Sequence, residues 1–224
     1  MTPHPIITDA HTHCPTAAQA VISVGPEEFS PKPGLLYSVG IHPWRSGSPG
    51  VSELLPLLER CASHRQVVAV GETGLDPLRG APLDVQLRLM QAHVAIASAA
   101  GKPLVVHCVR TSQQVLRLWR DTAADRRTPW MVHGFRGNER VLKPLAQAGI
   151  YIGYGMRFNA AALQATPRGQ LLIETDDSPL GIDATARAVA LSLGTTPQTI
   201  KALAQANATQ FFFPPTAKKM PATP

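Results

Sequence analysis

Short apolar runs rich in β-branched residues recur eight times along the chain. They predict buried β-strands centred near residues 8, 22, 38, 69, 105, 131, 151 and 173. After the third run, apolar residues recur at three- and four-residue spacing between the strands, which indicates amphipathic helices. In the helix after the fourth run, Asp84 is the expected N-cap and Gly101 the expected C-cap. Further helices are expected over residues 112–124, 138–148, 183–193 and 197–207.

Strands that alternate with helices form parallel βαβ units, and eight such strands fit either a (β/α)8 barrel or an open doubly wound sheet. A barrel builds its active site from the C-terminal ends of its strands, whereas an open sheet does so at one switch point. Here polar residues end at least six of the predicted strands. We therefore expect an α/β fold of the (β/α)8 TIM-barrel type.

The helices that would follow the first two strands are expected to be shortened or missing. Only residues 14–19 and 26–34 connect these strands, and the second segment contains three prolines. Proline in the interior of a helix removes a backbone hydrogen bond and clashes with the preceding turn. The outer face of these strands would then be covered by the Pro-rich loop, by the C-terminal helices or by a partner subunit.

The chain of 224 residues is 44% hydrophobic and can bury one full core, so we expect a single domain over residues 1–213. Residues 214–224 are rich in Pro, Lys and Ala and are expected to form a disordered tail. The formal charge of +6 is compatible with a polyanionic substrate. An odd set of three cysteines, no signal-peptide pattern and no apolar run of membrane-spanning length predict a cytoplasmic protein without membrane association.

Six residues with metal-binding side chains follow the predicted strands: His11, His13, Glu72, His107, His133 and Asp176. A single histidine at a strand end is often structural, but six ligand types on one face of a barrel favour a metal site. Four imidazoles and two carboxylates exceed the needs of one tetrahedral ion. We therefore expect two divalent ions, either Zn, Mn, Fe or Ni, or Mg with water completing its shell.

Six motifs follow one another along the chain. They are D-A-H-T-H at residues 9–13, S-V-G-I-H-P-W at 38–44, G-E-T-G-L-D at 71–76, V-H-C-V-R at 106–110, V-H-G-F-R-G at 132–137 and E-T-D at 174–176. In this order they resemble the motifs of the TatD-related metal-dependent deoxyribonucleases, in the amidohydrolase-like superfamily. The resemblance covers roughly residues 6–213, and the short early connections are similar to a short form of the family.

The resemblance implies a role for each candidate ligand. One ion would be held by His11, His13, Glu72 and Asp176, and a second by Glu72, His107 and His133. Glu72 would bridge the two ions, and Asp176 would accept the proton of the attacking water. Glu72 and Asp176 are therefore the candidate catalytic residues.

Residues next to the candidate ligands are weaker candidates for other roles. The candidate substrate-binding residues are His42, Arg110 and Arg136, since a guanidinium group can bind a phosphate. Trp44 could stack on a base or be an ordinary aromatic residue at the barrel rim. Asp9 and Asp76 could orient metal ligands or cap turns.

The expected function is that of a deoxyribonuclease that hydrolyses phosphodiester bonds, in single-stranded DNA or at DNA ends, through water activated by two metal ions. Related barrels hydrolyse amides, lactones and phosphotriesters, so an amidohydrolase-like enzyme for a small ester, amide or lactone is an alternative. A non-catalytic relict of the family is another. The protein is expected to act as a monomer or homodimer.

Overall fold

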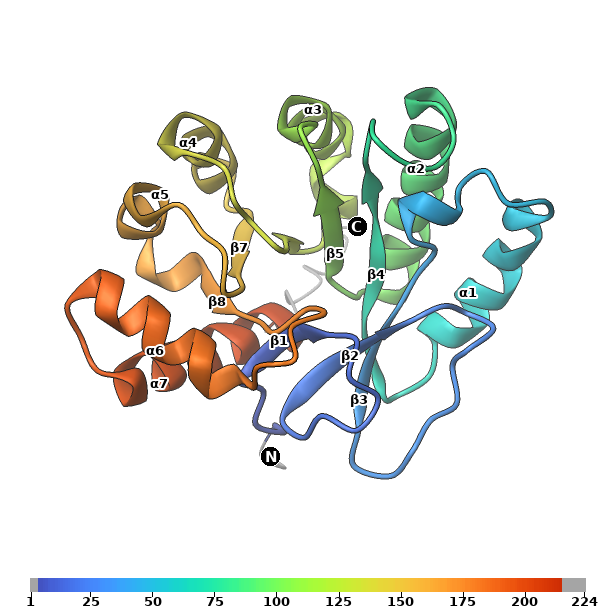
Figure 1. The fold of residues 1–224 in the computed structure, drawn as a ribbon. Helices are drawn as coiled ribbons and strands as arrows, with labels where there is room; N and C mark the ends of the chain where they lie inside the picture. Colours follow the sequence, from blue (N-terminus) through green and yellow to red (C-terminus); the bar gives the residue numbers. More distant parts are fainter. Residues whose placement is uncertain (1–3, 215–224) are drawn as a thin grey trace, which may run out of the picture.

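The computed structural model describes residues 4–214 and shows eight parallel strands in the order β1 to β8, with helices packed around part of the barrel (Figure 1). The strands are β1 (Asp9–Thr12), β2 (Ala20–Val24), β3 (Leu36–Val39), β4 (Val67–Leu75), β5 (Leu104–Cys108), β6 (Trp130–Val132), β7 (Tyr151–Tyr154) and β8 (Leu171–Ile173). The α-helices are α1 (Leu55–Ala62), α2 (Leu83–Ala100), α3 (Ser112–Asp121), α4 (Glu139–Gln147), α5 (Ala160–Ala165), α6 (Ile182–Leu193) and α7 (Pro197–Phe212). The predicted barrel and its strands are confirmed.

Hydrogen bonds between the first and last strands close the sheet into a nearly complete barrel. The backbone N–H of Asp176 donates to the carbonyl of His11 at 2.9 Å, and the N–H of His13 donates to the carbonyl of Asp176 at 3.0 Å. The buried carboxylate of Asp9 accepts hydrogen bonds from the backbone N–H and the hydroxyl of Thr175 at 3.0 and 2.6 Å. The closure therefore joins the segments that carry three of the predicted metal ligands.

The apolar core has an inner and an outer layer. Inside the barrel, Val105 and Met131 pack with residues that include Phe211 and Phe212 of α7. Side chains two apart on a strand share a face, so His107 and His133 point into the barrel like the apolar residues two positions before them. The outer layer, which includes the fully buried Trp130, lies between strands and helices.

The described segments 13–19 and 25–35 contain no helix, as predicted. The Pro-rich loop packs against β3 and the end of α1. The ring of Phe29 packs against the rings of Tyr37 and His64 at 5.3 Å, and the hydroxyl of Tyr37 donates to the carbonyl of Ser30 at 3.4 Å. The thiol of Cys61 on α1 lies 3.7 Å from the carbonyl of Pro26. These contacts place the loop on β3 and α1, and the cover of the first two strands stays a prediction.

Some element boundaries differ from the predicted ones. Strand β4 continues past Glu72 to Leu75, because Thr73, Gly74 and Leu75 pair with β5. The N-cap of α2 is Pro82 rather than Asp84, which lies in the first turn and pairs with Arg88 at 3.0 Å. Helix α5 was not predicted, and α7 extends to Phe212.

Two further expectations concern the ends of the chain and membranes. The expected disordered tail from 214 to 224 lies, except for Pro214, outside the described residues. Among residues 4–214, no helix combines the length and apolar character needed to cross a membrane.

His93 on α2 is buried and hydrogen-bonded in its neutral form. Its Nε2 accepts from the backbone N–H of Ile41 at 2.9 Å, so Nδ1 carries the proton and donates to the carbonyl of Leu89 at 2.8 Å. Burial lowers the pKa of His93 from 6.5 to about 4. His93 is therefore protonated below pH 6.5 in the unfolded chain, but only below about pH 4 in the folded chain. Between these pH values, protonation stabilises the unfolded state.

We predict that the contribution of His93 to the free energy of unfolding falls by about 2 kcal/mol between pH 7 and pH 5. Urea unfolding at both pH values, on wild type and on His93→Gln, measures it. Glutamine can keep both hydrogen bonds but does not titrate, so the difference between the two proteins isolates the histidine. An equal loss of stability in both proteins would show that His93 does not contribute.

Candidate metal centre

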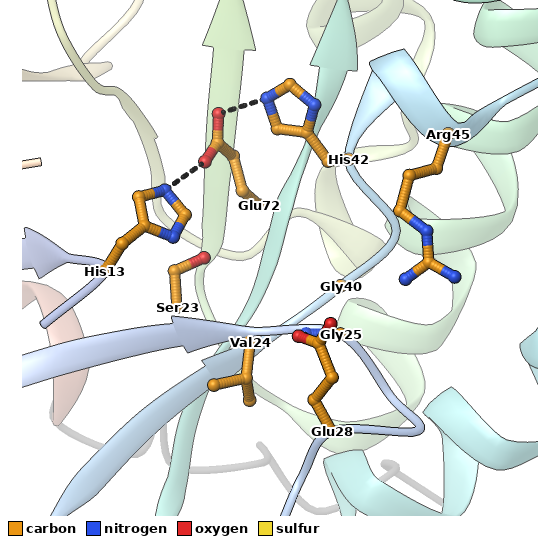
Figure 2. Close-up of a pocket in the computed structure, with 9 residues that line it drawn as sticks. All are labelled: His13, Ser23, Val24, Gly25, Glu28, Gly40, His42, Arg45 and Glu72. Atoms are coloured by element: carbon orange, nitrogen blue, oxygen red, sulfur yellow. Dashed lines mark hydrogen bonds and ion pairs between the residues drawn. The ribbon is translucent and has the colours of Figure 1, made fainter. Parts of the chain in front are cut away.

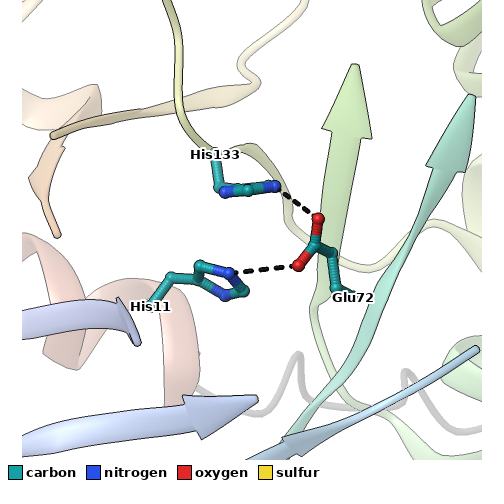
Figure 3. Close-up of side chains that lie close together, drawn as sticks. All are labelled: His11, Glu72 and His133. Carbon is teal, nitrogen blue, oxygen red and sulfur yellow. Dashed lines mark hydrogen bonds and ion pairs between the residues drawn. The ribbon is translucent and has the colours of Figure 1, made fainter. Parts of the chain in front are cut away.

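Glu72 lies at the centre of a histidine cluster at the C-terminal end of the barrel. Its Oε1 atom is 2.7 Å from both His107 Nδ1 and His133 Nε2 (Figure 3 shows His133). His42 Nε2 lies 3.0 Å from the same oxygen (Figure 2). Three ring nitrogens around one carboxylate oxygen exceed its two lone pairs, which suits cation binding in addition to hydrogen bonding.

The second oxygen of Glu72 faces the other candidate ligands. Its Oε2 atom is 3.2 Å from His11 Nε2 and 3.5 Å from His13 Nε2 (Figures 2 and 3). Asp176 completes this side, with Oδ1 3.7 and 3.6 Å from the same two nitrogens. Asp176 follows β8 in the left-handed region, at φ 54°, which aspartate adopts more readily than most residues. All six predicted ligands are therefore brought together.

Opposing electrostatic effects act on Glu72. Burial alone would raise its pKa, but the imidazoles of His133, His107, His11 and His13 outweigh burial and hold the pKa well below the usual value of 4.5. Burial likewise lowers the pKa of His133, but the charges of Glu72 and Glu174 raise it well above 6.5. The centre thus favours an ionised carboxylate that needs nearby positive charge.

Several buried polar atoms of the cluster have no hydrogen-bond partner among the described residues. These atoms are both ring nitrogens of His11, Oε2 of Glu72 and Nδ1 of His133. Buried polar atoms are normally paired, and imidazole nitrogens with carboxylate oxygens are the donors that divalent transition metals accept. The residues present therefore fit a metal ion.

The structure groups the ligands differently from the predicted assignment. Three groups have donor atoms within 4.8 Å of one another: His11, Glu72 and His133; His11, His13 and Asp176; and His42, Glu72 and His107. The second group contains three of the four ligands predicted for the first ion and lacks Glu72. The predicted second ion draws its histidines from two groups, although His107 Nδ1 and His133 Nε2 are only 3.4 Å apart. The division of ligands between two ions stays a prediction.

Glu174 is a member of the centre to which the sequence assigned no role. It is fully buried beneath His133, with Oε1 3.5 Å from the ring Nδ1, and it accepts the N–H of Gly134 at 2.5 Å. A carboxylate on this side of the ring favours the orientation in which Nε2 faces Glu72, through an ion-pair contact rather than a hydrogen bond. In the sequence the only signal for Glu174 was its place in the E-T-D motif at residues 174–176, directly after the last predicted strand.

Asp9 and Asp76 each contact a candidate ligand. Asp76 Oδ2 lies 3.4 Å from His107 Nε2, and its Oδ1 accepts the N–H of Leu78 at 2.9 Å, so it both orients a ring and caps a turn. Asp9 Oδ1 accepts the N–H of His11 at 3.3 Å. Burial raises the pKa of Asp9 to about 7.

The three candidate substrate-binding residues lie in different settings. His42 belongs to the cluster itself, and its Nδ1 accepts the N–H of Trp44 at 3.2 Å. Arg110 and Arg136 are exposed, and neither side chain has a hydrogen bond or ion pair with residues 4–214. Their contact with substrate stays a prediction.

A cavity of about 130 Å³ opens beside the cluster, above the ends of β2 and β3. His13 and His42 point into it toward Glu72, and Arg45 and Glu28 line its outer part (Figure 2). Arg45, which the sequence did not single out, is paired with Glu27. The cavity adjoins the connections that lack helices, so the shortened segments border the site.

The imidazole–carboxylate cluster lies at the C-terminal ends of the parallel strands, which is where barrel enzymes build their active sites. The family model described as TatD related DNase matches residues 26–212, and the chain belongs to this family. The match begins after the D-x-H-x-H motif. The assignment of residues 9–13 to the metal centre therefore rests on the motif and on the geometry of the cluster.

Among the relatives, the 3′-5′ ssDNA/RNA exonuclease TatD of Musicola paradisiaca is 32% identical over 162 residues, 64% of this chain and 58% of the relative. An uncharacterized metal-dependent hydrolase of Bacillus subtilis, YabD, is 25% identical over 72% of this chain and 64% of its own length. The matched part thus spans less than two thirds of either relative.

Solved structures support the fold. A TatD homologue from Escherichia coli K12, YjjV, superposes with a TM-score of 0.71 at 23% identity, covering 87% of this chain and 85% of the other. A TatD family hydrolase from Entamoeba histolytica gives a TM-score of 0.70 at 18% identity, covering 88% of this chain and 85% of the other.

Gly153 on β7 leaves room for the side chain of Glu174. A larger residue at position 153 therefore tests whether Glu174 positions His133. A Cβ atom at this position would lie 2.3 Å from Glu174 Oε2 and 3.2 Å from the Cα of His133. We predict that Gly153→Ala lowers the free energy of unfolding by about 1–3 kcal/mol and weakens metal binding, because the carboxylate must move.

Gly155→Ala is the matched control, since its Cβ would meet the backbone of Glu174 at an ordinary 3.8 Å. Metal titration followed by thermal unfolding of both variants measures the difference. If Gly153→Ala binds metal as tightly as the control, Glu174 does not position His133.

Proposed function

We propose that this protein is a metal-dependent hydrolase that cleaves phosphodiester bonds in single-stranded nucleic acid, with DNA ends as the first candidate substrate. The observation that carries the proposal is the buried carboxylate of Glu72 with imidazoles on both of its oxygens. Membership of the TatD related DNase family supports it. So does a relative whose name states ssDNA/RNA exonuclease.

The proposed centre holds two divalent ions. His11, His13 and Asp176 would hold one ion and His107 with His133 the other, with Glu72 between them. Bound divalent ions supply an activated water and neutralise charge on a phosphoryl group. The side chains of the protein would hold the ions and accept the proton of the water.

Asp176 is the proposed acceptor of the proton. Its side chain is 25% exposed, whereas that of Glu72 is 3% exposed, so Asp176 is the carboxylate that incoming water reaches. Its left-handed backbone aims the side chain at His11 and His13. Glu72 is buried among imidazoles that keep it ionised, which suits a bridging ligand rather than a proton carrier.

We also propose a cytoplasmic location and action as a monomer or homodimer. The described cysteines, Cys14, Cys61 and Cys108, are all free thiols, which is typical of a reducing compartment.

Hydrolysis of a labelled single-stranded oligonucleotide with and without Mg or Mn tests the proposal. We expect metal-dependent cleavage that Glu72→Ala abolishes. Glu28→Ala is the control, because Glu28 lines the same cavity outside the histidine cluster. If a folded, metal-loaded protein does not cleave, the nuclease proposal is wrong and a small ester, amide or lactone becomes the substrate to test.

Asp176→Asn separates metal binding from turnover. We predict that this variant still binds at least one ion, because Glu72 and the histidines remain, but loses turnover by about 100-fold or more, because the amide cannot accept a proton. Metal analysis by mass spectrometry and single-turnover kinetics measure the two effects. Retained turnover would remove Asp176 from the proton-transfer role.

Salt dependence tests the proposed phosphate contacts of Arg110 and Arg136. Each arginine that neutralises a phosphate on a single strand should contribute about 0.7 to the slope of log affinity against log salt. Arg110→Ala and Arg136→Ala should each reduce the slope by about that amount. Arg88→Ala is the control, because Arg88 is paired with Asp84 on α2. Unchanged slopes would exclude both contacts.

A further inference from the structure

Trp44 is an aromatic side chain at the mouth of the site that no role in the metal centre uses. It follows the cluster histidine His42 by two residues, in the short 3-10 turn η1 (Pro43–Arg45). Its ring centroid lies 4.7 Å from that of His42 and 5.9 Å from that of His107. The ring is therefore a direct neighbour of two histidines of the cluster.

The ring is exposed although it is held firmly. Trp44 is 47% exposed, whereas Trp130 in the core is 1% exposed, so a large part of the surface of Trp44 is open to solvent. Its indole N–H donates to Asp76 Oδ2 at 2.7 Å, which ties it to the carboxylate that orients His107. The guanidinium of Arg79 covers the ring at 4.2 Å from its centroid.

The two loops that carry Trp44 and Arg79 are locked together. The hydroxyl of Ser46 accepts the N–H of Ala81 at 2.9 Å and donates to the carbonyl of Pro43 at 2.5 Å. Gly80, at φ 81°, lies so close to Pro43 that a Cβ atom would be 2.2 Å from its carbonyl oxygen. A half-exposed aromatic ring with a fixed orientation loses little conformational entropy when a ligand stacks on it.

We propose that Trp44 is a stacking platform for a nucleobase of the substrate strand, with Arg79 supporting its covered side. This inference rests on the proposed nuclease function and extends it to the recognition of the base. Aromatic rings bind bases of single strands without reading their sequence, because every base has a π face. A base stacked there places its own backbone beside the metal centre. The platform therefore predicts preference for unpaired ends and tolerance of sequence.

The test is a double-mutant cycle, in which the ring of Trp44 is removed from the protein and the terminal bases are removed from the substrate. Cleavage kinetics are measured for wild type and Trp44→Leu, on a single-stranded oligonucleotide and on the same strand with abasic sites at its last two positions. Stacking predicts that removal of the bases raises the KM of wild type at least about fivefold, whereas Trp44→Leu has the same high KM on both strands. Trp44→Phe keeps a ring and should restore most of the difference.

Trp119 on α3 is the matched control, since Arg127 stacks on its ring at 4.3 Å in the same way. Trp119→Leu should leave both KM values unchanged. A second readout does not depend on turnover: in the Asp176→Asn background with Mg present, the oligonucleotide should quench tryptophan fluorescence. The quenching should disappear with Trp44→Phe and persist with Trp119→Phe.

Three results would contradict the proposed platform. If Trp44→Leu raises KM equally on both strands, the ring only supports the loop and the platform is wrong. It is also wrong if Trp44→Leu behaves like wild type while cleavage proceeds. If the wild-type protein cleaves no oligonucleotide, the proposed function fails and the platform fails with it.

Discussion

A buried, ionised carboxylate is the constraint on which this structure depends. Taking the charge of Glu72 out of water is unfavourable unless positive charge or hydrogen-bond donors surround it. Imidazoles from four other strand ends supply that environment, on both carboxylate oxygens. Their ring nitrogens can serve a proton or a metal ion, and several of them have no partner within the described chain. The negative charge of Glu72 is thus compensated only when protons or metal ions lie between its carboxylate and the imidazoles.

The surrounding structure holds these groups at their positions. Glu174 and Asp76 lie behind His133 and His107 and fix which ring nitrogen faces the carboxylate. Glycine makes the close packing possible, since the strand at Gly153 leaves no room for a side chain against Glu174. The bonds between β1 and β8 close the barrel where His11 and Asp176 emerge. The hydrogen bonds that close the barrel therefore also hold the backbone of His11, His13 and Asp176 in place.

Most of the fold and the composition of the cluster could be predicted from the sequence. Strand periodicity located all eight strands, and polar residues at their ends indicated the site. The end of β4 was missed because pairing of Thr73 and Gly74 with β5 is a tertiary effect. The contact of His42 with Glu72 was missed because the path of the chain after β3 depends on a hydrogen bond from Ile41 to the distant His93. Local patterns do not report such contacts.

The location of the metal ions tests the central claim most directly. Crystals soaked in Mn should give anomalous difference peaks beside the carboxylate of Glu72. We predict two peaks, one near His11, His13 and Asp176 and the other near His107 and His133. A single peak would contradict the bridging role of Glu72. Peaks only outside the cluster would contradict the metal centre itself.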